Sequence, residues 1–131
     1  MMLVDTQPIA RTHRAEIGSR LVLGLGRSGP AIHQAATLTE YFQRMGWNVT
    51  TSQDNAEVAR ESHKMAEGFV VLQVDQGGLL SAAKLKLTRP NVRIVLLGCR
   101  SPEQIRDAEF IGAIPMVDAS GLMDPAFTLT A

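Results

Sequence analysis

The 131-residue sequence contains a single cysteine, Cys99, and no long apolar run. It has no excess of charge either, since 13 basic residues balance 13 acidic ones. A single cysteine excludes an intramolecular disulfide framework and any metal site built from several cysteines. A net charge of zero argues against nucleic-acid binding by this domain, because such domains usually carry a basic stripe. No run approaches the roughly 18 apolar residues of a membrane span, and none near the N-terminus fits a signal-peptide core. We therefore expect a cytoplasmic protein that does not contact membranes.

Hydrophobic residues make up 45% of the chain, and 20% of the residues are charged, which is typical of a globular domain. The length fits one domain and leaves little for a second. Residues 1–19 show less periodicity than the rest, and we interpret them as an N-terminal arm. Residues 20–131 are expected to form the domain.

From residue 20 onward, short apolar runs alternate with helical patterns. Strands are predicted over residues 21–23, 47–51, 69–74, 92–97 and 113–117, and helices over residues 31–45, 55–66, 79–87 and 102–111. Apolar strands joined to helices by short loops indicate a parallel sheet covered on both faces. The predicted fold class is a three-layer, flavodoxin-like α/β domain with a five-stranded parallel sheet in the order 2-1-3-4-5.

In such a fold, ligands bind at the carboxyl ends of the strands, near the place where the strand order reverses. A functional site is therefore expected in the loops that follow the strands. These loops are residues 24–30, 73–78, 98–101 and 118–121.

The stretch from Gly46 to Gly121 resembles the receiver domain of bacterial response regulators. MGWNVTTSQDNAEVARESHKMAEGFVVLQ has the receiver layout of strand, helix and third strand. RPNVRIVLLGCRSPEQIRDAEFIGAIPMVDAS resembles the fourth strand, the fourth helix and the Gly-Ala step into the fifth strand. The resemblance implies a receiver-like fold and a role in signal transduction.

The resemblance also implies where phosphorylation chemistry would reside. Receivers hold Mg²⁺ with an acidic pair after strand one and an aspartate after strand three, because this cation prefers carboxylate oxygens. A hydroxyl after strand four and a lysine after strand five contact the phosphoryl group. In this chain the acidic pair falls on residues 24–26, which are Gly-Leu-Gly, and the remaining positions fall on Gln73, on Gly98 or Cys99, and on Ala119.

Asp75 is the carboxylate nearest the missing acceptor, two residues beyond Gln73. With at most one carboxylate left, Mg²⁺ should bind weakly and aspartyl phosphate should not form. We interpret Asp75 as a solvated or loop-capping residue, and a displaced acceptor is the alternative. The resemblance thus predicts a pseudo-receiver, a degenerate receiver that has lost its phosphorylation pocket.

A glycine-rich turn, Gly24-Leu25-Gly26-Arg27-Ser28-Gly29, matches G-x-G-x-x-G directly after a strand and before a helix. Glycines let the backbone approach a phosphate, and a helix N-terminus offers free N–H groups. Gly24, Gly26, Arg27, Ser28 and Gly29 are therefore candidate ligand-binding residues. A dinucleotide site also needs an acidic residue at the end of the second strand. Asp54 is the only acid nearby and is interpreted as a helix cap, so a tight structural turn is the other interpretation.

The segment LVLGLGRSGPAIHQAATLTEYFQRMGWNV is similar in spacing to the first strand and helix of cobalamin-binding domains. The D-x-H-x-x-G motif of that family would fall on Gly29, Ala31 and Gln34, so every signature residue is absent. His33 lies two positions away, on the wrong side of the helix to ligate cobalt. The resemblance leaves only a pocket shape, without a ligand for the metal.

The carboxyl end contains little room for the fifth amphipathic helix that closes a receiver, and Pro125 limits it further. One flank of the sheet would then need another cover. We expect Leu122, Met123, Phe127 and Leu129 to contribute to a surface for self-association or for a protein partner.

No paired acid and base and no nucleophile–base arrangement is present, so an enzyme is not expected. The histidines lack metal-site spacing, and no metal or cofactor is predicted. Cys99 is interpreted as a small buried side chain, with a reactive thiol as the alternative. The expected function is a non-catalytic regulatory module that acts through contacts with a protein partner, with a second copy of itself as a dimer, or both. The alternative is a small-molecule binding domain that uses residues 24–30 for a nucleotide, a phosphate or a cobalamin-type ligand.

Overall fold

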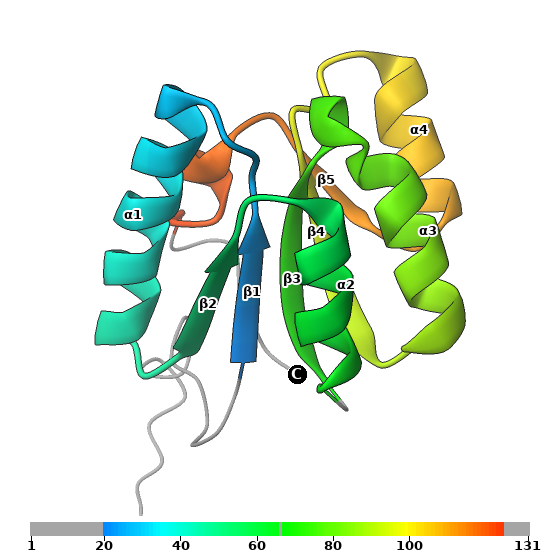
Figure 1. Cartoon of the computed structure of the whole chain (residues 1–131). Helices are drawn as coiled ribbons and strands as arrows, with labels where there is room; N and C mark the ends of the chain where they lie inside the picture. The colour runs from blue at the N-terminus through cyan, green and yellow to red at the C-terminus, as the bar shows by residue number, and fades with distance from the viewer. Residues whose placement is uncertain (1–19, 66, 125–131) are drawn as a thin grey trace, which may run out of the picture.

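The computed structural model describes residues 20–65 and 67–124. Five parallel strands form one sheet in the order β2-β1-β3-β4-β5, as predicted (Figure 1). The strands are β1 (Arg20–Gly24), β2 (Asn48–Ser52), β3 (Gly68–Gln73), β4 (Val92–Leu97) and β5 (Ile114–Met116). The helices are α1 (Gly29–Arg44), α2 (Asn55–His63), α3 (Gly78–Thr88) and α4 (Pro102–Phe110), with short 3₁₀ turns η3 (Val74–Gln76) and η4 (Ala119–Gly121).

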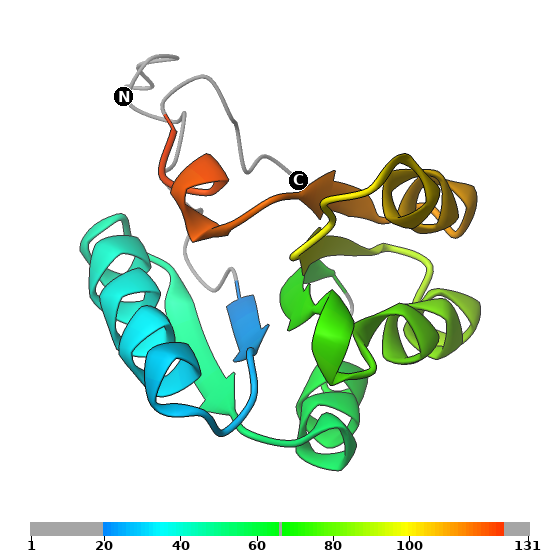
Figure 2. The same cartoon turned by 90° about the horizontal axis from the view of Figure 1, so that it is seen from above.

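Helices cover both faces of the sheet, so the three-layer prediction is confirmed. Helix α1 lies on one face, and α2, α3 and α4 lie on the other (Figure 2). Successive side chains of a strand point to opposite faces. Leu21 and Leu23 therefore pack toward α1, while Val22 packs under α2. Burial on both faces explains why β1, β3 and β4 are largely continuous apolar runs rather than alternating patterns.

An aromatic row organises the core on the α1 side. Phe42 of α1 contacts Trp47 edge-to-face with ring centroids 6.4 Å apart, and Trp47 contacts Phe69 of β3 at 5.6 Å. Edge-to-face pairs are favourable because the positive edge of one ring meets the negative face of the other. The row links the end of α1 to the centre of the sheet.

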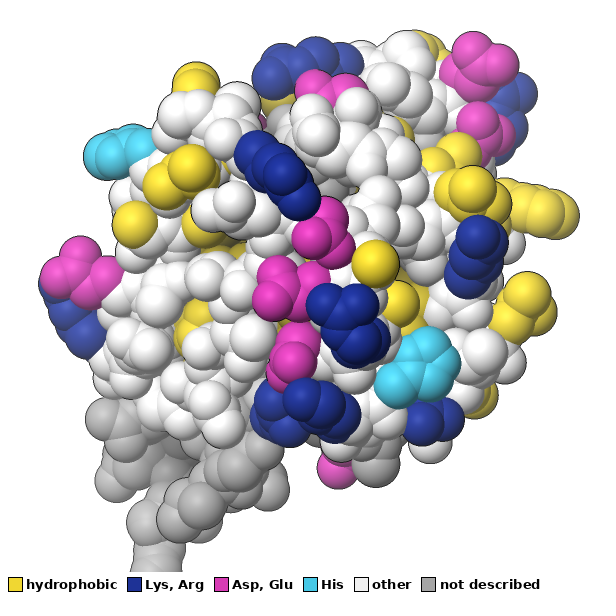
Figure 3. Space-filling model, in the orientation of Figure 1, with side chains coloured by type: hydrophobic (Ala, Val, Ile, Leu, Met, Phe, Trp, Pro, Cys, Tyr) yellow, Lys and Arg dark blue, Asp and Glu magenta, His cyan; other side chains and the backbone are white. Residues whose placement is uncertain are grey.

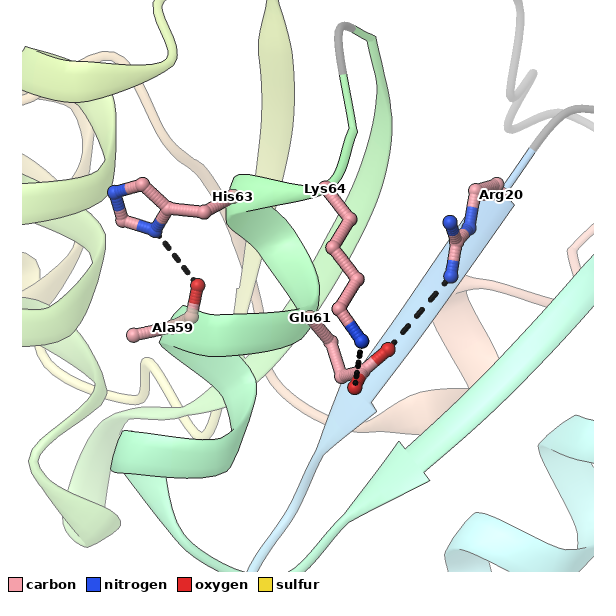
Figure 4. A network of polar contacts seen from close by, with 5 residues as sticks. All are labelled: Arg20, Ala59, Glu61, His63 and Lys64. Carbon is pink, nitrogen blue, oxygen red and sulfur yellow. Dashed lines mark hydrogen bonds and ion pairs between the residues drawn. The ribbon is translucent and has the colours of Figure 1, made fainter.

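A polar network ties α2 to the first strand (Figure 4). Glu61 of α2 lies 3.7 Å from the Arg20 guanidinium and 3.1 Å from the Lys64 ammonium. In addition, the Arg89 guanidinium donates to the His63 carbonyl at 2.8 Å, across the ends of α2 and α3. A cation at a helix C-terminus satisfies an unpaired carbonyl and complements the helix dipole.

Most element boundaries differ from the sequence prediction by one to three residues, and only β4 matches it at both ends. Strand β3 ends at Gln73, because the chain turns into η3 at Val74 on the way to Gly77, which has φ of 75°. The predicted strand over residues 69–74 was therefore shifted by one residue toward the C-terminus. Helix α2 ends at His63, within the predicted range of 55–66.

The chain beyond β5 differs from a simple exposed tail. Ala119 and Leu122 are 5% and 0% exposed and belong to the core on the α1 side, where Met123 also packs. Leu122 is therefore a core side chain and cannot contribute to an open contact surface, contrary to the expectation from its apolar character. Within the described residues the only element after β5 is η4. The other two predicted contact residues, Phe127 and Leu129, and the arm of residues 1–19 lie outside the described residues.

Side chains cap the starts of α1, α2 and α4, and α4 has the most complete cap. The Ser101 hydroxyl accepts from the Gln104 N–H at 3.1 Å, and the Gln104 side chain accepts from the Ser101 N–H at 3.1 Å. This reciprocal capping box satisfies two N–H groups that a helix leaves unpaired.

We expect Ser101→Ala to lower the free energy of unfolding by about 1 kcal/mol, because the Gln104 N–H loses its acceptor. Urea denaturation measures this loss. Ser81→Ala is the control, because it removes a serine hydroxyl from within α3 rather than from a helix cap. An unchanged unfolding midpoint for Ser101→Ala would show that the cap contributes nothing.

Candidate functional site at the carboxyl ends of the strands

The loops that follow the five parallel strands meet at one edge of the sheet, at the top of Figure 1. Hydrogen bonds join two of them directly. The Gly98 N–H donates to the Val117 carbonyl and the Cys99 N–H donates to the Met116 carbonyl, both at 3.0 Å. The loops after β4 and β5 are therefore fixed relative to each other, at the position where a receiver holds its hydroxyl and its lysine.

Gln73, at the acceptor position, is the last residue of β3 and reaches across to the end of β4. A Cβ atom placed on Gly98 would lie 2.7 Å from Gln73 Nε2, so the amide occupies the space beside Gly98. Gly98 also has φ of 87°, a conformation that side chains with a Cβ rarely adopt. The space beside the end of β4 therefore holds a neutral amide where the resemblance would place an acceptor and a hydroxyl.

A second amide lies on the neighbouring loop. Gln76 of η3 packs on Gly26, since a Cβ there would lie 3.2 Å from the Gln76 side chain. Asn55 fixes this loop by donating to the Gln76 carbonyl at 2.9 Å. Asp75, the nearest carboxylate to the acceptor position, lies between these glutamines in η3 and is exposed.

Two of the three glycines in the glycine-rich turn, Gly24 and Gly26, have structural reasons. Gly24 is buried, and a Cβ there would lie 2.5 Å from Val58 Cγ2. Gly26 has φ of 106° and faces Gln76. Ser28 is the N-cap of α1, accepting from the Ala31 N–H at 3.1 Å, and Gly29 is the first residue of that helix. These contacts account for Gly24, Gly26 and Ser28 without a ligand, whereas a Cβ on Gly29 would meet open space.

Arg27, the cation of the turn, is exposed and pairs with Asp54 at 3.4 Å. Asp54 is also the N-cap of α2, as the sequence predicted, and accepts from the Glu57 N–H at 2.7 Å. This hydrogen bond, together with the positive charges of Arg27 and Arg60, lowers the pKa of the Asp54 carboxyl below its usual value. The acid nearest the turn is thus engaged by a helix cap and an arginine.

Cys99 is 1% exposed and belongs to the core on the α2–α4 side. Its thiol donates to the Leu96 carbonyl at 3.5 Å. Burial raises the pKa of the thiol, because the thiolate would lose its solvation. The geometry matches the small buried side chain expected from sequence rather than the reactive thiol.

Asp118 has a local role that the sequence analysis missed. It is the N-cap of η4, where its carboxylate accepts from the N–H of Ser120 at 3.0 Å and from the Ser120 hydroxyl. The hydroxyl and N–H bonds, followed by the charge of Arg100, lower the pKa of Asp118. The signal was present in the Asp-Ala-Ser spacing, which favours an Asx-type turn. Ala119, at the lysine position, turns into the core.

The side chains at this edge of the sheet do not form a cluster that could bind a metal ion, within the described residues. Over residues 20–65 and 67–124, no three His, Cys, Asp or Glu side chains come together in a way that could hold an ion. The three carboxylates of the edge loops, Asp54, Asp75 and Asp118, follow three different strands. A receiver's Mg²⁺ site needs several carboxylate oxygens around one point.

A shallow groove at the opposite edge has a volume of about 380 Å³. It is lined by His63, Lys64, Met65, Thr88, Arg89, Pro90 and Asn91. Its cations are already engaged, because Lys64 pairs with Glu61 and Arg89 donates to the His63 and Thr88 carbonyls. Since the C-terminal ends of α2 and α3 also point here, the basic residues are explained by helix capping.

The computed fold is similar to two solved structures from Burkholderia pseudomallei. The first is a response regulator protein whose crystals contain a phosphorylated aspartic acid, a calcium ion and citrate; the TM-score is 0.66 at 19% identity, over 86% of this chain and 67% of that one. The second is a pilus assembly-related protein, with a TM-score of 0.60 at 12% identity, over 94% of this chain and 87% of that one. These similarities confirm the receiver-like fold.

The other comparisons add no family. No known family model matches the chain, and no curated protein matches it. In the described part of the chain, no helix combines the length and the apolar character that crossing a membrane requires.

We expect Gly98→Ala to lower the free energy of unfolding by about 1–2 kcal/mol, because a Cβ is strained at this positive φ. Urea denaturation measures the loss. Combining the change with Gln73→Ala removes the contact with the amide but not the backbone strain, so recovery should be partial. If the double variant recovered the full free energy of unfolding, backbone strain at residue 98 would not be the cause. If Gly98→Ala caused no loss, neither the strain nor the contact with the Gln73 amide would matter.

We expect the Cys99 thiol to resist modification in the folded protein. A thiol-reactive disulfide reagent should label it at a rate set by unfolding, and labelling should become fast in urea above the unfolding midpoint. The release of the coloured thiol product measures the rate. Rapid labelling of the folded protein, as fast as that of a small free thiol, would contradict the buried geometry.

Proposed function

We propose that this chain is a non-catalytic, receiver-like regulatory module that works through protein contacts and does not use a phosphoryl group. The observation that carries the proposal is the Gln73 amide beside Gly98, at the end of β3 where the resemblance would place the phosphoacceptor. An amide is a poor nucleophile and carries no charge to hold a divalent cation. The receiver-like fold supports a signalling role, while the residues at the carboxyl edge support a loss of chemistry.

Two further parts of the pocket agree with this assignment. Residues 24–26 replace the acidic pair with Gly-Leu-Gly, and Leu25 is buried in the core. Ala119 replaces the lysine and is also buried. A single substitution therefore cannot rebuild the pocket, because acceptor, metal ligands and cation are all absent from their places.

We expect no Mg²⁺-dependent phosphorylation of the wild-type chain. Incubation with Mg²⁺ and a small phosphodonor such as acetyl phosphate should leave the intact mass unchanged, and beryllium fluoride with Mg²⁺ should not raise the melting temperature. A ligand at 100 times its Kd would add about 2.7 kcal/mol of stability, which a thermal shift detects easily.

Two variants make this test sharper. Gln73→Asp should also fail to bind Mg²⁺, because the acidic pair after β1 is missing. Asp75→Asn removes the carboxylate nearest the acceptor position and should behave like the wild type. Phosphate incorporation by the wild type that Asp75→Asn abolishes would overturn the proposal and make Asp75 a working acceptor.

Binding of a nucleotide, a phosphate or a cobalamin-type ligand at residues 24–30 stays a prediction that no contact in the structure favours. The same thermal-shift assay tests it with ATP, inorganic phosphate and cobalamin. Stabilisation that Gly26→Asp abolishes would favour the ligand-binding module instead.

A further inference from the structure

The most exposed large hydrophobic side chains of the described residues lie on two neighbouring helices. Phe110 of α4 is 90% exposed, and Leu87 and Leu80 of α3 are 86% and 63% exposed. Hydrophobic side chains accordingly appear on the surface over α3 and α4, at the right of Figure 3. Isolated apolar side chains are common on protein surfaces, so their arrangement matters more than their number.

The arrangement follows one spacing on both helices. Leu80, Lys84 and Leu87 of α3 lie at i, i+4 and i+7, and therefore on one side of the helix. Glu103, Asp107 and Phe110 of α4 repeat this spacing. All six side chains are exposed, whereas Ala82 and Leu85 of α3 and Ala108 of α4 are buried against the sheet.

The two helices lie next to each other on the same face of the sheet (Figures 1 and 2). A Cβ placed on Gly112, just after α4, would lie 3.5 Å from Lys86 Cε of α3. This proximity places the end of α4 beside α3. We call the six exposed side chains of the two neighbouring helices the α3–α4 face: Leu80, Lys84, Leu87, Glu103, Asp107 and Phe110.

The two helices carry charges of opposite sign. On the α3–α4 face itself, α3 contributes Lys84 and α4 contributes Glu103 and Asp107. Helix α3 carries Lys84 and Lys86 and no acid, whereas α4 carries three acids, Glu103, Asp107 and Glu109, against one base, Arg106. In the described part of the chain, the ion pairs involve none of these charged side chains of α3 and α4. A basic helix with two leucines thus lies beside an acidic helix with a phenylalanine.

We infer that the α3–α4 face binds a second copy of the same chain through a two-fold axis. A two-fold interface uses the same surface on both subunits. If α3 of one copy packs on α4 of the other, the dimer contains two contacts between a lysine-bearing helix and an acidic helix. The apolar side chains are then buried between the two copies. Packing α3 on α3 would instead place like charges together, which opposes association. The inference deepens the proposed function by naming a second copy of the chain as the partner. It rests on the proposed function only in the premise that the domain acts through protein contacts.

The size of the face sets the expected strength. Helices of 11 and 9 residues are about 16 Å and 14 Å long. Two such helices per copy bury an area at the low end of specific interfaces, below about 1,200 Å² in total. We therefore expect a weak, reversible dimer whose association falls as salt screens the charges.

Charge exchange between the helices tests the pairing. One variant makes α3 acidic (Lys84→Glu with Lys86→Glu), and the other makes α4 basic (Glu103→Lys with Asp107→Lys). Sedimentation velocity of the full chain at low salt should show concentration-dependent association of the wild type. Each variant alone should associate at least about tenfold more weakly, because each brings like charges together.

An equimolar mixture of the two variants should associate again. At one contact the acidic α3 of the first variant meets the basic α4 of the second, and at the other contact the unchanged basic α3 of the second meets the unchanged acidic α4 of the first. Circular dichroism establishes that each variant is folded. The matched control exchanges charges on α1, where Glu40 and Arg44 form an ion pair at 2.9 Å; Glu40→Lys with Arg44→Glu should leave association unchanged.

Three results would overturn the inference. The wild type could remain monomeric at the highest soluble concentration, both charge variants could associate like the wild type, or their mixture could stay monomeric. None of these measurements involves Mg²⁺ or a phosphodonor. Failure of the dimer would therefore leave the assignment of an inactive phosphorylation pocket in place, and phosphorylation of the chain would not affect the dimer test.

Discussion

Burial of the sheet on both faces is the constraint from which the other features of this molecule follow. β1, β3 and β4 form the centre of the sheet, and most of their side chains are in contact with one or other layer of helices. Such strands run parallel and are joined by helices, so every strand ends at the same edge. This geometry brings Gln73, Gly98 and the glycine-rich turn together, although they are far apart in the sequence. It also leaves the outer sides of the helices as the surface on which partners can act.

Sequence patterns predicted the strand order, the helices and their caps because these features depend on local signals. Ser28, Asp54 and Ser101 each precede an amphipathic segment and cap it, and the sequence analysis named Asp54 in this role. The receiver resemblance likewise placed Gln73 and Gly98 at matching positions, since these positions follow from strand ends. It could not predict that the Gln73 amide fills the space beside Gly98, because this contact joins two loops through a side-chain conformation.

Exposure was harder to predict than secondary structure. Leu122 is an apolar residue near the end of the sequence, and the same letter fits a contact surface or a core. The structure buries it beside Ala119, because η4 turns the chain back onto the α1 side of the sheet. Phe110 is the converse case, an aromatic residue at the end of an amphipathic helix that the structure leaves in solvent. Periodicity gives the face of a helix, but the end of a helix can extend beyond the layer that covers it.

A net charge of zero describes the whole chain and conceals how its charges are divided. The balance argues against nucleic acid as a partner, since a phosphate backbone requires a continuous positive surface. It does not argue against a protein partner, because an excess of bases on α3 and of acids on α4 cancel in the sum while remaining separate in space. Two copies of such a surface are complementary under a two-fold axis, whereas a uniformly charged surface would repel its own copy. Loss of the phosphorylation pocket would remove one means of control, yet it leaves the outer face of the helices intact. A receiver-like domain without phosphoryl chemistry can therefore keep a function that depends on contact alone.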